Sequence, residues 1–419
     1  MTGRLTRRDA LAGIGGVLGA SAFGPIRARA QTPSVSVATR NCYLGANLFR
    51  LLAAATVTDT SLPEAVGNLV TAVDRSYVER RLGAVADELA RTTPDLVGVQ
   101  EAPLIRTGAP TDGTTPTATD VRYDFRETLR SALSARDLPY RVVAATETTD
   151  IQLPATVDGE RLGVRLTDRD LILAHESATA GDPVTGTFDA SFSLTRNDRT
   201  VTINRGYGVV DATVGGTRLT FCNTHLESVS AETRGKQATE LRGLLDGRED
   251  PVVLVGDLNS GPGASTAVYD DFTGPYRDAA SDAGNTCCHA ADLRNAKPTL
   301  DSRIDHVLVR GDLRATDVTR LGADPADRIA VESGDDVDRL WPSDHAGVVA
   351  TLAPEVATPT STATPTRTAT ATRTATPTVT ATDADPTRTV GSAPGYGSGA
   401  AVSALAVAAL AAFRRARDD

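Results

Sequence analysis

The sequence predicts a layered α/β domain between residues 31 and about 354. Valine and leucine recur every three or four positions over residues 78–89, which is typical of an amphipathic helix. Residues 252–255 form an unbroken apolar run, as in a strand buried on both faces. Patterns of both kinds alternate along the whole segment without an internal linker. We therefore expect one α/β domain whose polar residues gather where strands end.

The other elements follow from the same periodicities. Residues 34–39 alternate polar and apolar side chains and predict a strand, and residues 95–101 predict a strand that ends in charge. Phe125, Leu129 and Ala132 mark a second amphipathic helix. Further strands are expected near Leu171, Val209, Leu219, Val307 and Val348.

The composition is acidic and poor in lysine. The net charge is −10, the pI is about 5.1, and Lys236 and Lys297 are the only lysines among 43 basic residues. Such a balance does not suggest a protein held to nucleic acid by a large basic surface. It is typical of halophilic proteins, for which charges are screened within about 3 Å at molar salt. Lack of a basic surface therefore excludes a nucleic-acid substrate only weakly.

The N-terminal 30 residues have the order of an export signal. Arg7 and Arg8 precede an apolar run over residues 10–23, and Ala28-Arg29-Ala30 offers a cleavage site. The paired arginines resemble a twin-arginine (Tat) signal. The run is shorter than the roughly 20 residues that a membrane-spanning helix needs.

The C-terminal segments predict a surface anchor. Residues 355–393 are repeats of Thr, Pro and Ala that should remain a disordered stalk. Residues 394–419 join Pro-Gly-Tyr to an apolar run and a basic tail, and resemble the sorting signals of archaeal surface proteins, in which Phe stands where Tyr396 is here. We expect the protein to be exported and held at the cell surface by this end, through a lipid after cleavage or through a retained helix.

Four cysteines, Cys42, Cys222, Cys287 and Cys288, are too few for a disulfide scaffold. The adjacent pair lies next to His289 without the spacing of a zinc site. We interpret these cysteines as buried or incidental, with one disulfide as the alternative.

Polar residues cluster at six predicted strand ends. These stretches are residues 39–41, 99–101, 223–226, 256–259, 303–306 and 343–345. Neighbouring strand ends lie side by side, so we expect the six stretches to converge on one pocket. Asp257 and Asn259 are two apart and face the same side, and Gly256 would let a ligand approach the backbone.

In order and in local context, these stretches resemble the signature of the endonuclease/exonuclease/phosphatase superfamily from Asn41 to His345. The resemblance implies a four-layer α/β/β/α sandwich and hydrolysis of phosphate esters. His225, in Asn-Thr-His-Leu, is similar to the second histidine of the subtype that includes pancreatic deoxyribonuclease and bacterial sphingomyelinases.

The resemblance implies a metal site and a catalytic histidine. Glu101 would be the main ligand of Mg²⁺, or alternatively Mn²⁺, with Asn41 nearby and Asp344 facing the metal. His345 would be the general base or a charged clamp on the phosphate, oriented by Asp305, and the adjacent carboxylate would raise its pKa.

Five further residues complete the expected site. His225 would bind phosphate or protonate the leaving group, with Asp168 as its candidate partner. Asp257 would position the attacking water, and Asn259 would hold a phosphate oxygen. Arg205 would contact the substrate phosphate, or alternatively form a surface ion pair. The three other histidines, His175, His289 and His306, are interpreted as structural.

The leading hypothesis is a secreted nuclease that acts on DNA or RNA. A sphingomyelinase-like lipid phosphodiesterase is second, although Trp341 is the only tryptophan and no aromatic hairpin is visible for membrane contact. A phosphomonoesterase is third, and a surface module without catalysis is last. We expect membrane contact only through the C-terminal anchor and no obligate protein partner.

Overall fold

The computed structural model describes residues 33–48, 60–110, 115–196, 199–248, 251–263, 265–333 and 336–355. The chain divides into two units, Met1–Ala357 and Thr358–Asp419, and every described residue lies in the first. Apart from Glu355, the predicted export signal, stalk and anchor lie outside the described residues. Within the described ranges, no helix is both long and apolar enough to cross a membrane.

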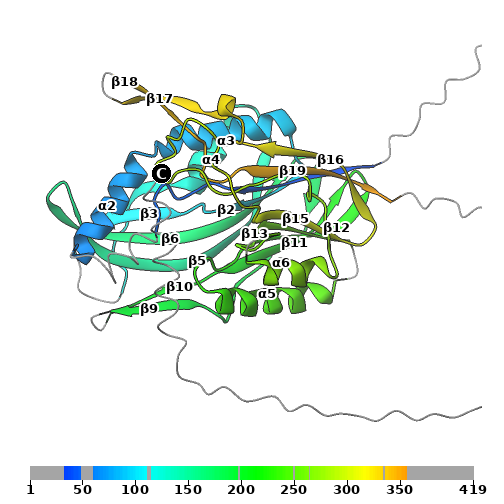
Figure 1. Ribbon diagram of the computed structural model, residues 1–419, viewed down its shortest axis with the longest axis horizontal. Helices are drawn as coiled ribbons and strands as arrows, with labels where there is room; N and C mark the ends of the chain where they lie inside the picture. The colour runs from blue at the N-terminus through cyan, green and yellow to red at the C-terminus, as the bar shows by residue number, and fades with distance from the viewer. Residues whose placement is uncertain are drawn as a thin grey trace, which may run out of the picture. The chain divides into compact units, whose positions relative to one another are not determined.

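The domain is built around two large β-sheets (Figure 1). The first has eight strands in the order β16-β19-β1-β2-β6-β3-β4, with β5 paired to β6. Its strands are β1 (Val35–Asn41), β2 (Leu96–Gln100), β3 (Leu104–Gly108), β4 (Asp120–Asp124), β5 (Tyr140–Val157), β6 (Glu160–His175), β16 (Leu313–Leu321) and β19 (Gly347–Pro354).

The second sheet has seven strands in the order β14-β15-β13-β12-β11-β7, with β8 paired to β11. They are β7 (Ala178–Ala180), β8 (Val184–Thr187), β11 (Gly206–Val214), β12 (Thr217–His225), β13 (Val252–Asp257), β14 (Arg277–Asp278) and β15 (Asp305–Arg310). Two separate hairpins are formed by β9 (Phe192–Arg196) with β10 (Arg199–Ile203), and by β17 (Ile329–Ser333) with β18 (Asp336–Leu340).

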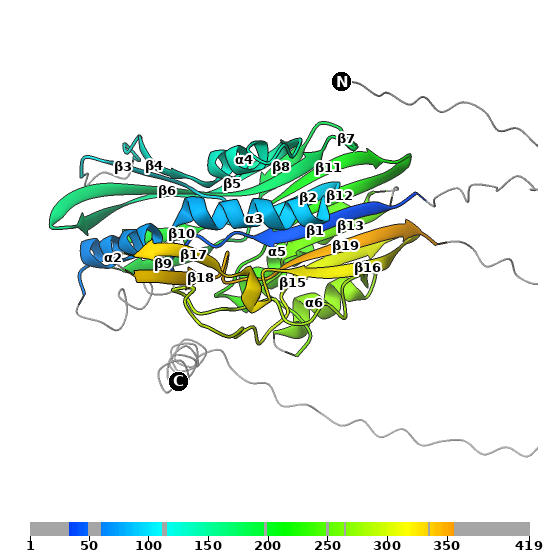
Figure 2. The same cartoon turned by 90° about the horizontal axis from the view of Figure 1, so that it is seen from above.

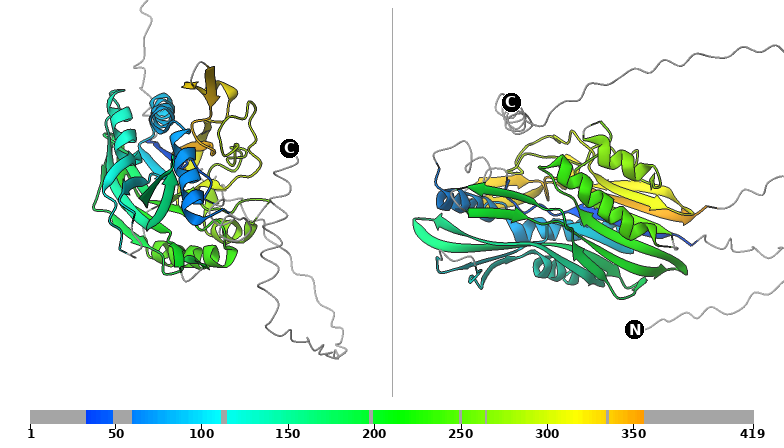
Figure 3. Two further views of the ribbon diagram at one scale, coloured as in Figure 1. Left: turned by 90° about the vertical axis from the view of Figure 1, so that its left-hand side faces the viewer. Right: turned by 90° about the horizontal axis from the view of Figure 1, so that it is seen from below.

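Helices cover the outer faces of both sheets (Figure 1, Figure 2). They are α2 (Leu62–Asp74), α3 (Val78–Thr92), α4 (Phe125–Ser134), α5 (Ala231–Asp246) and α6 (Thr266–Thr273), with a 3₁₀ turn η1 at Pro325–Asp327. Buried side chains of α2, α3 and α4 pack on the first sheet, and those of α5 and α6 pack on the second. Seen from below, α5 and α6 lie over the second sheet (Figure 3). A third apolar cluster joins the two sheets, so the predicted α/β/β/α sandwich is confirmed.

Strand register brings the polar residues to one end of the sandwich. In the first sheet, β1 and β2 are parallel and Asn41 pairs with Gln100. In the second, β12 and β13 are parallel and pair His225 with Asp257, while antiparallel β15 pairs Asp305 with Asp257. Three of the predicted site residues therefore stand in one row across three strands.

Asn223 connects the two sheets beside this row. Its Nδ2 donates to the carbonyl oxygens of Val99 and Leu171 at 3.0 and 2.9 Å, and its Oδ1 accepts from Gln100 Nε2 at 2.6 Å. A Cβ on Gly98 would lie 2.6 Å from that Oδ1, so only glycine allows the approach. The buried polar side chain fixes the position of the second sheet against β2.

Gly256 has a different role from the one we expected. A Cβ at this position would lie 2.0 Å from the carbonyl oxygen of Thr224 in β12, and the φ of Gly256 is +144°. Close approach of the neighbouring strand, rather than of a ligand, therefore requires this glycine.

Candidate active site

Two histidines flank one buried carboxylate at the end of the second sheet. Asp257 Oδ2 lies 3.5 Å from His225 Nε2 and 3.8 Å from His345 Nε2. His345 Nδ1 lies 2.8 Å from Asp305 Oδ2. All four residues are buried, so these groups act on one another through little intervening solvent.

The carboxylates around His345 favour the charged form of its imidazole. Burial by itself lowers the pKa of an imidazole, but the charges of Asp305, Asp344 and Asp257 outweigh burial and raise the pKa of His345 well above 6.5. The bond from Nδ1 to Asp305 also fixes the ring, so that Nε2 faces Asp257. The geometry gives Asp305 the orienting position that the resemblance implied.

His225 and Asp168, which we expected to pair, are joined through Arg205 in the structure and not directly. Arg205 lies between them, with Nη1 3.0 Å from His225 Nδ1 and 3.5 Å from Asp168 Oδ2. The Arg205 side chain is 11% exposed, which also contradicts a surface ion pair. Burial, then the charges of Arg205 and His345, lower the pKa of His225 well below 6.5. Nδ1 of His225 accepts from Arg205, and these surroundings favour the neutral imidazole.

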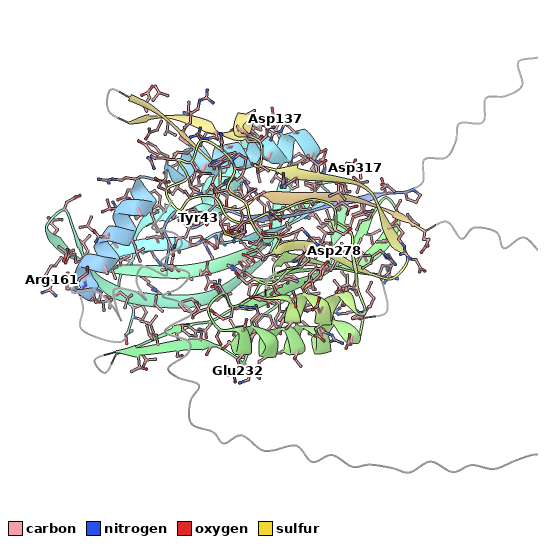
Figure 4. The ribbon with its side chains drawn as sticks, in the orientation of Figure 1. Tyr43, Asp137, Arg161, Glu232, Asp278 and Asp317 are labelled. Atoms are coloured by element: carbon pink, nitrogen blue, oxygen red, sulfur yellow. A yellow bond between two sulfur atoms is a disulfide. The ribbon has the colours of Figure 1, made fainter. Side chains whose placement is uncertain are left out.

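Glu101 and Asn41 lie on the other side of Asp257, where β1 and β2 end. Asn41 Nδ2 donates to Glu101 Oε1 at 3.2 Å and to Asp257 Oδ2 at 3.3 Å. Leu44 N donates to Glu101 Oε2 at 2.8 Å, and Tyr43 N donates to Asn41 Oδ1 at 2.9 Å; Tyr43 is marked in Figure 4. Asn41 thus links the two carboxylates, and its oxygen is turned toward the backbone instead of outward to a metal.

The charge of this site fits a divalent cation. Asp257, Asp305 and His345 can offer ligand atoms within 4.8 Å of one another. Among the described residues, Asp305 Oδ1 and Asp344 Oδ1 are buried without a hydrogen-bond partner. Burial is the main cause that raises the pKa of Asp257 to about 7, and the charge of Asp305 adds to it. Burial also raises the pKa of Asp344 to about 7; the charge of His345 opposes this shift, and that of Glu101 adds to it. Excess negative charge on hard oxygen donors is the chemistry that Mg²⁺ or Mn²⁺ requires.

Asn259 supports the catalytic row from the loop after β13. Its φ is +48°, its backbone N donates to Asp257 Oδ1 at 2.9 Å, and its Nδ2 donates to the carbonyl oxygen of Leu226 at 2.9 Å. One amide N–H is thereby occupied in holding the segment after His225. At most one remains to hold a phosphate oxygen, the role we predicted.

Two buried arginines, for which we predicted no role, position the site. Arg81 donates to the carbonyl oxygens of Cys42, Tyr43 and Pro342 at 2.8, 3.0 and 3.1 Å. It thereby clamps the segment after β1 to the segment that carries Asp344.

Arg40 has a similar function one strand end away. It forms a buried ion pair with Glu88 at 2.9 Å and donates to the carbonyl oxygen of His345. Arg81 and Glu88 both fall at the edge of the apolar face predicted over residues 78–89. Charged residues at the edge of an apolar helix face are a sequence signal that the helix carries buried, paired charges. Arg81 and Glu88 provide that signal here.

Replacing Arg81 with methionine should lower the free energy of unfolding by about 3 kcal/mol, because four carbonyl groups, that of Ser76 included, lose their donor. Hydrolysis should weaken as well, since both clamped segments carry site residues. Urea unfolding and kcat, measured on the same preparation, test this. Arg80→Met is the matched control, because Arg80 is exposed and, within the described ranges, its side chain donates one hydrogen bond, to the Ala330 carbonyl. Equal stability of the two variants would contradict the clamp.

The remaining histidines make contacts outside the catalytic row. His289 stacks on Trp341 with ring centroids 3.8 Å apart, and His306 Nε2 lies 2.8 Å from the carbonyl oxygen of Ser260. His175 ends β6 and contacts Ser177. These contacts agree with the structural roles we assigned.

The cysteines divide into two kinds. Cys42 and Cys222 are free and buried, as interpreted, and burial raises the pKa of Cys42 to about 12. Cys287 and Cys288 form a disulfide, which was our alternative.

An α/β/β/α sandwich with carboxylates and two histidines at facing strand ends defines a hydrolytic, metal-binding class of site. The family model described as "Endonuclease/Exonuclease/phosphatase family" matches residues 67–345, more than half of the chain. The protein therefore belongs to this family of phosphoester hydrolases, whose members generally depend on a divalent metal.

The chain is also similar to solved structures at low sequence identity. The chain is similar to an endonuclease/exonuclease/phosphatase family protein from Bacteroides thetaiotaomicron at 16% identity, covering 78% of this chain and 100% of that one, with a TM-score of 0.49. A mannosyl-6-phosphatase from the same species matches at 15% identity, 76% and 99% coverage and a TM-score of 0.48. A Bacteroides vulgatus family protein matches at 17% identity, 77% and 99% coverage and a TM-score of 0.45. No curated protein matches significantly.

Proposed function

We propose that this protein is an exported, Mg²⁺-dependent nuclease that hydrolyses phosphodiester bonds in DNA or RNA. The observation that carries the proposal is the placement of His225 and His345 on either side of Asp257. Cleaving a phosphodiester requires a group that takes a proton from water and a group that supports the leaving oxygen. Two imidazoles that face one carboxylate suit that division of roles.

Glu101 and Asp344 would hold the Mg²⁺, with Asn41 orienting Glu101 through its amide. When bound, the ion neutralises charge on the phosphoryl oxygens and lowers the barrier to attack. A cation at Asp344 would offset part of the charge that raises the pKa of His345, so that more of this imidazole would be neutral and able to accept a proton.

The chain's own residues then divide the remaining work. His345 Nε2 takes the proton of the attacking water, and Asp305 stabilises the resulting imidazolium through Nδ1. Asp257 and Asn259 orient the water and a phosphate oxygen. Arg205 and His225 face the phosphate from the opposite side, where Arg205 supplies the positive charge and Asp168 holds it in place.

Surface composition favours nucleic acid over lipid. Trp341 is fully buried, so it cannot anchor the protein in a membrane. In the part of the chain that the structure describes, exposed large apolar side chains are single and aliphatic: Leu48, Val121, Val184, Val229 and Val337. Such isolated residues do not make the apolar patch that a lipid surface would contact.

The test is nicking of supercoiled plasmid by the full chain, in dilute and in concentrated salt. We expect nicking with Mg²⁺ and its loss when a chelator removes the metal, because the carboxylates cannot replace the cation's charge. Single-stranded RNA, sphingomyelin vesicles and a phosphomonoester run in parallel as competing substrates. Turnover of either of the last two, without cleavage of any nucleic acid, would overturn the nuclease proposal while leaving a phosphoester hydrolase.

Export and surface anchoring are part of the proposal. They rest on the sequence patterns of residues 1–30 and 394–419. Fractionation of cells that express the full chain tests both, because an exported, anchored protein should be found with the envelope and be accessible to added protease.

A further inference from the structure

The Cys287–Cys288 disulfide lies directly against the segment that carries His345. Cys287 forms isolated β-bridges with Ser302 and with His345. Ala346 N donates to the carbonyl oxygen of Thr286 at 2.7 Å, and His289 N donates to that of Asp344 at 2.8 Å. Both flanks of the disulfide are therefore hydrogen-bonded to both flanks of the histidine.

The same contacts reach the second member of the catalytic pair. Thr286 Oγ1 accepts from Asp305 N at 3.2 Å, and Ser302 N donates to the carbonyl oxygen of Cys287 at 2.9 Å. The two sulfur atoms consequently have a fixed position relative to the pair of His345 and Asp305.

Three potential metal ligands meet at this point. The Sγ atoms of Cys287 and Cys288 and one ring nitrogen of His345 lie within 4.8 Å of one another. Zinc binds thiolate at about 2.3 Å and imidazole at about 2.0 Å, so ligands of one ion are separated by roughly 4 Å. The two sulfur atoms, which are bonded to each other here, must therefore move apart after reduction. His289, which is adjacent in sequence, is instead stacked on Trp341. The fold thus supplies a histidine from a distant part of the chain, which the cysteine spacing did not reveal.

We propose that reduction of the Cys287–Cys288 disulfide opens a site for one thiophilic divalent cation, such as Zn²⁺, with Cys287, Cys288 and His345 as ligands. A dithiol reductant supplies two electrons and two protons, the S–S bond breaks, two thiols form, and the reductant leaves as a disulfide. The cation then displaces the two thiol protons and the proton on the bound ring nitrogen of His345, and binds both thiolates and that nitrogen. Cys288 is only partly buried, which gives reductant and metal a route to the pair.

His345 would then belong to two ligand sets of opposite character. Carboxylates on one side favour Mg²⁺, whereas thiolates on the other favour Zn²⁺ or Cd²⁺. A ring nitrogen bound to the thiophilic ion is unavailable for hydrolysis, so that ion should inhibit the reduced protein and spare the oxidised one. This consequence rests on the proposed function, but the metal site itself does not.

The first experiment measures metal binding without activity. The full chain is reduced with a dithiol, freed of reductant without air, and titrated with Co²⁺ alone. We expect thiolate-to-cobalt charge-transfer absorption that saturates at one ion per chain, and none in the oxidised protein. Cys288→Ser should abolish the absorption, whereas Cys222→Ser, which removes a buried free cysteine, should keep it. Absence of the band in reduced protein, or its survival in Cys288→Ser, would overturn the site.

The second experiment measures inhibition with Mg²⁺ present throughout. Low concentrations of Zn²⁺ should slow plasmid nicking by the reduced protein about tenfold or more, and should affect the oxidised protein and Cys288→Ser little. Equal inhibition of all three would show that Zn²⁺ acts elsewhere and would overturn the link to His345. If the cobalt band forms but no substrate is hydrolysed, the proposed function fails and the metal site stands.

Discussion

The His345→Ala variant is expected to hydrolyse phosphodiesters about 10³-fold more slowly than the unchanged protein, measured as kcat at saturating Mg²⁺. The imidazole is buried, bonded to Asp305 at 2.8 Å and directed at Asp257, so no water can take its place in the same geometry. The metal and Arg205 remain, and their charge accounts for the activity that should persist.

Two further variants separate catalysis from folding. His175→Ala is the matched control, since His175 ends β6 and contacts Ser177 away from the catalytic row; its kcat should be unchanged. Asp305→Asn should lower kcat about 10²-fold, because an amide cannot stabilise the imidazolium that forms. If His345→Ala keeps about a tenth or more of the activity, His345 is not the proton acceptor and the mechanism fails.

Much of the fold was predictable because its signals are local. Residues 252–255 are almost completely buried in β13, and the helix predicted over residues 78–89 is α3. The signal that located Glu101 and Asp257 was equally local, because each follows an apolar run that can only be a buried strand. Where two such strands are parallel neighbours in a sheet, their carboxyl ends lie together. The register of β12 with β13 places His225 beside Asp257 in this way.

What the sequence could not supply depends on pairings between distant segments. Nothing near Asp168 or His225 indicates that Arg205 lies between them, because that contact is set by the packing of β6 against the segment that precedes β11. We predicted that Gly256 lets a ligand approach the backbone, because the sequence of one strand does not show which residue of the neighbouring strand lies opposite it. The approach of Cys287 to His345 is of the same kind, since it depends on how the loop after β14 folds back.

The buried carboxylates also indicate how this site relates to stability. Burial opposes the charged form of each, and their mutual repulsion adds to the cost, as the raised pKa values of Asp257 and Asp344 show. The arrangement therefore stabilises the fold less than apolar packing would, and its benefit appears only when a cation is bound. Removing one of these carboxylates should consequently affect function and stability in opposite directions.

Glu101→Gln tests that expectation. The Mg²⁺ concentration for half-maximal nicking should rise about 100-fold, because an amide lacks the charge of the carboxylate. The new side-chain amide must also face the Asn41 amide, which in the unchanged protein donates to Glu101 Oε1 at 3.2 Å. Without metal, the variant should unfold at the same or higher urea concentration, because the charge that helps to raise the pKa of Asp344 is gone. Nicking rates across a Mg²⁺ series and urea unfolding in chelator give the two readouts.

The control for this variant is Glu232→Gln, which neutralises a fully exposed glutamate paired with Lys236 on α5 and should change neither measurement. A metal-free Glu101→Gln protein that is much less stable than the control would show that Glu101 mainly supports the fold, through Leu44 N and Asn41. An unchanged Mg²⁺ requirement would place the cation elsewhere, at Asp257 and Asp305 beside His345. Glu101 is the main ligand only if the variant needs more Mg²⁺ and, without metal, is at least as stable as the control. The charge of a ligand stabilises the fold when the ion is bound and destabilises it when the ion is absent.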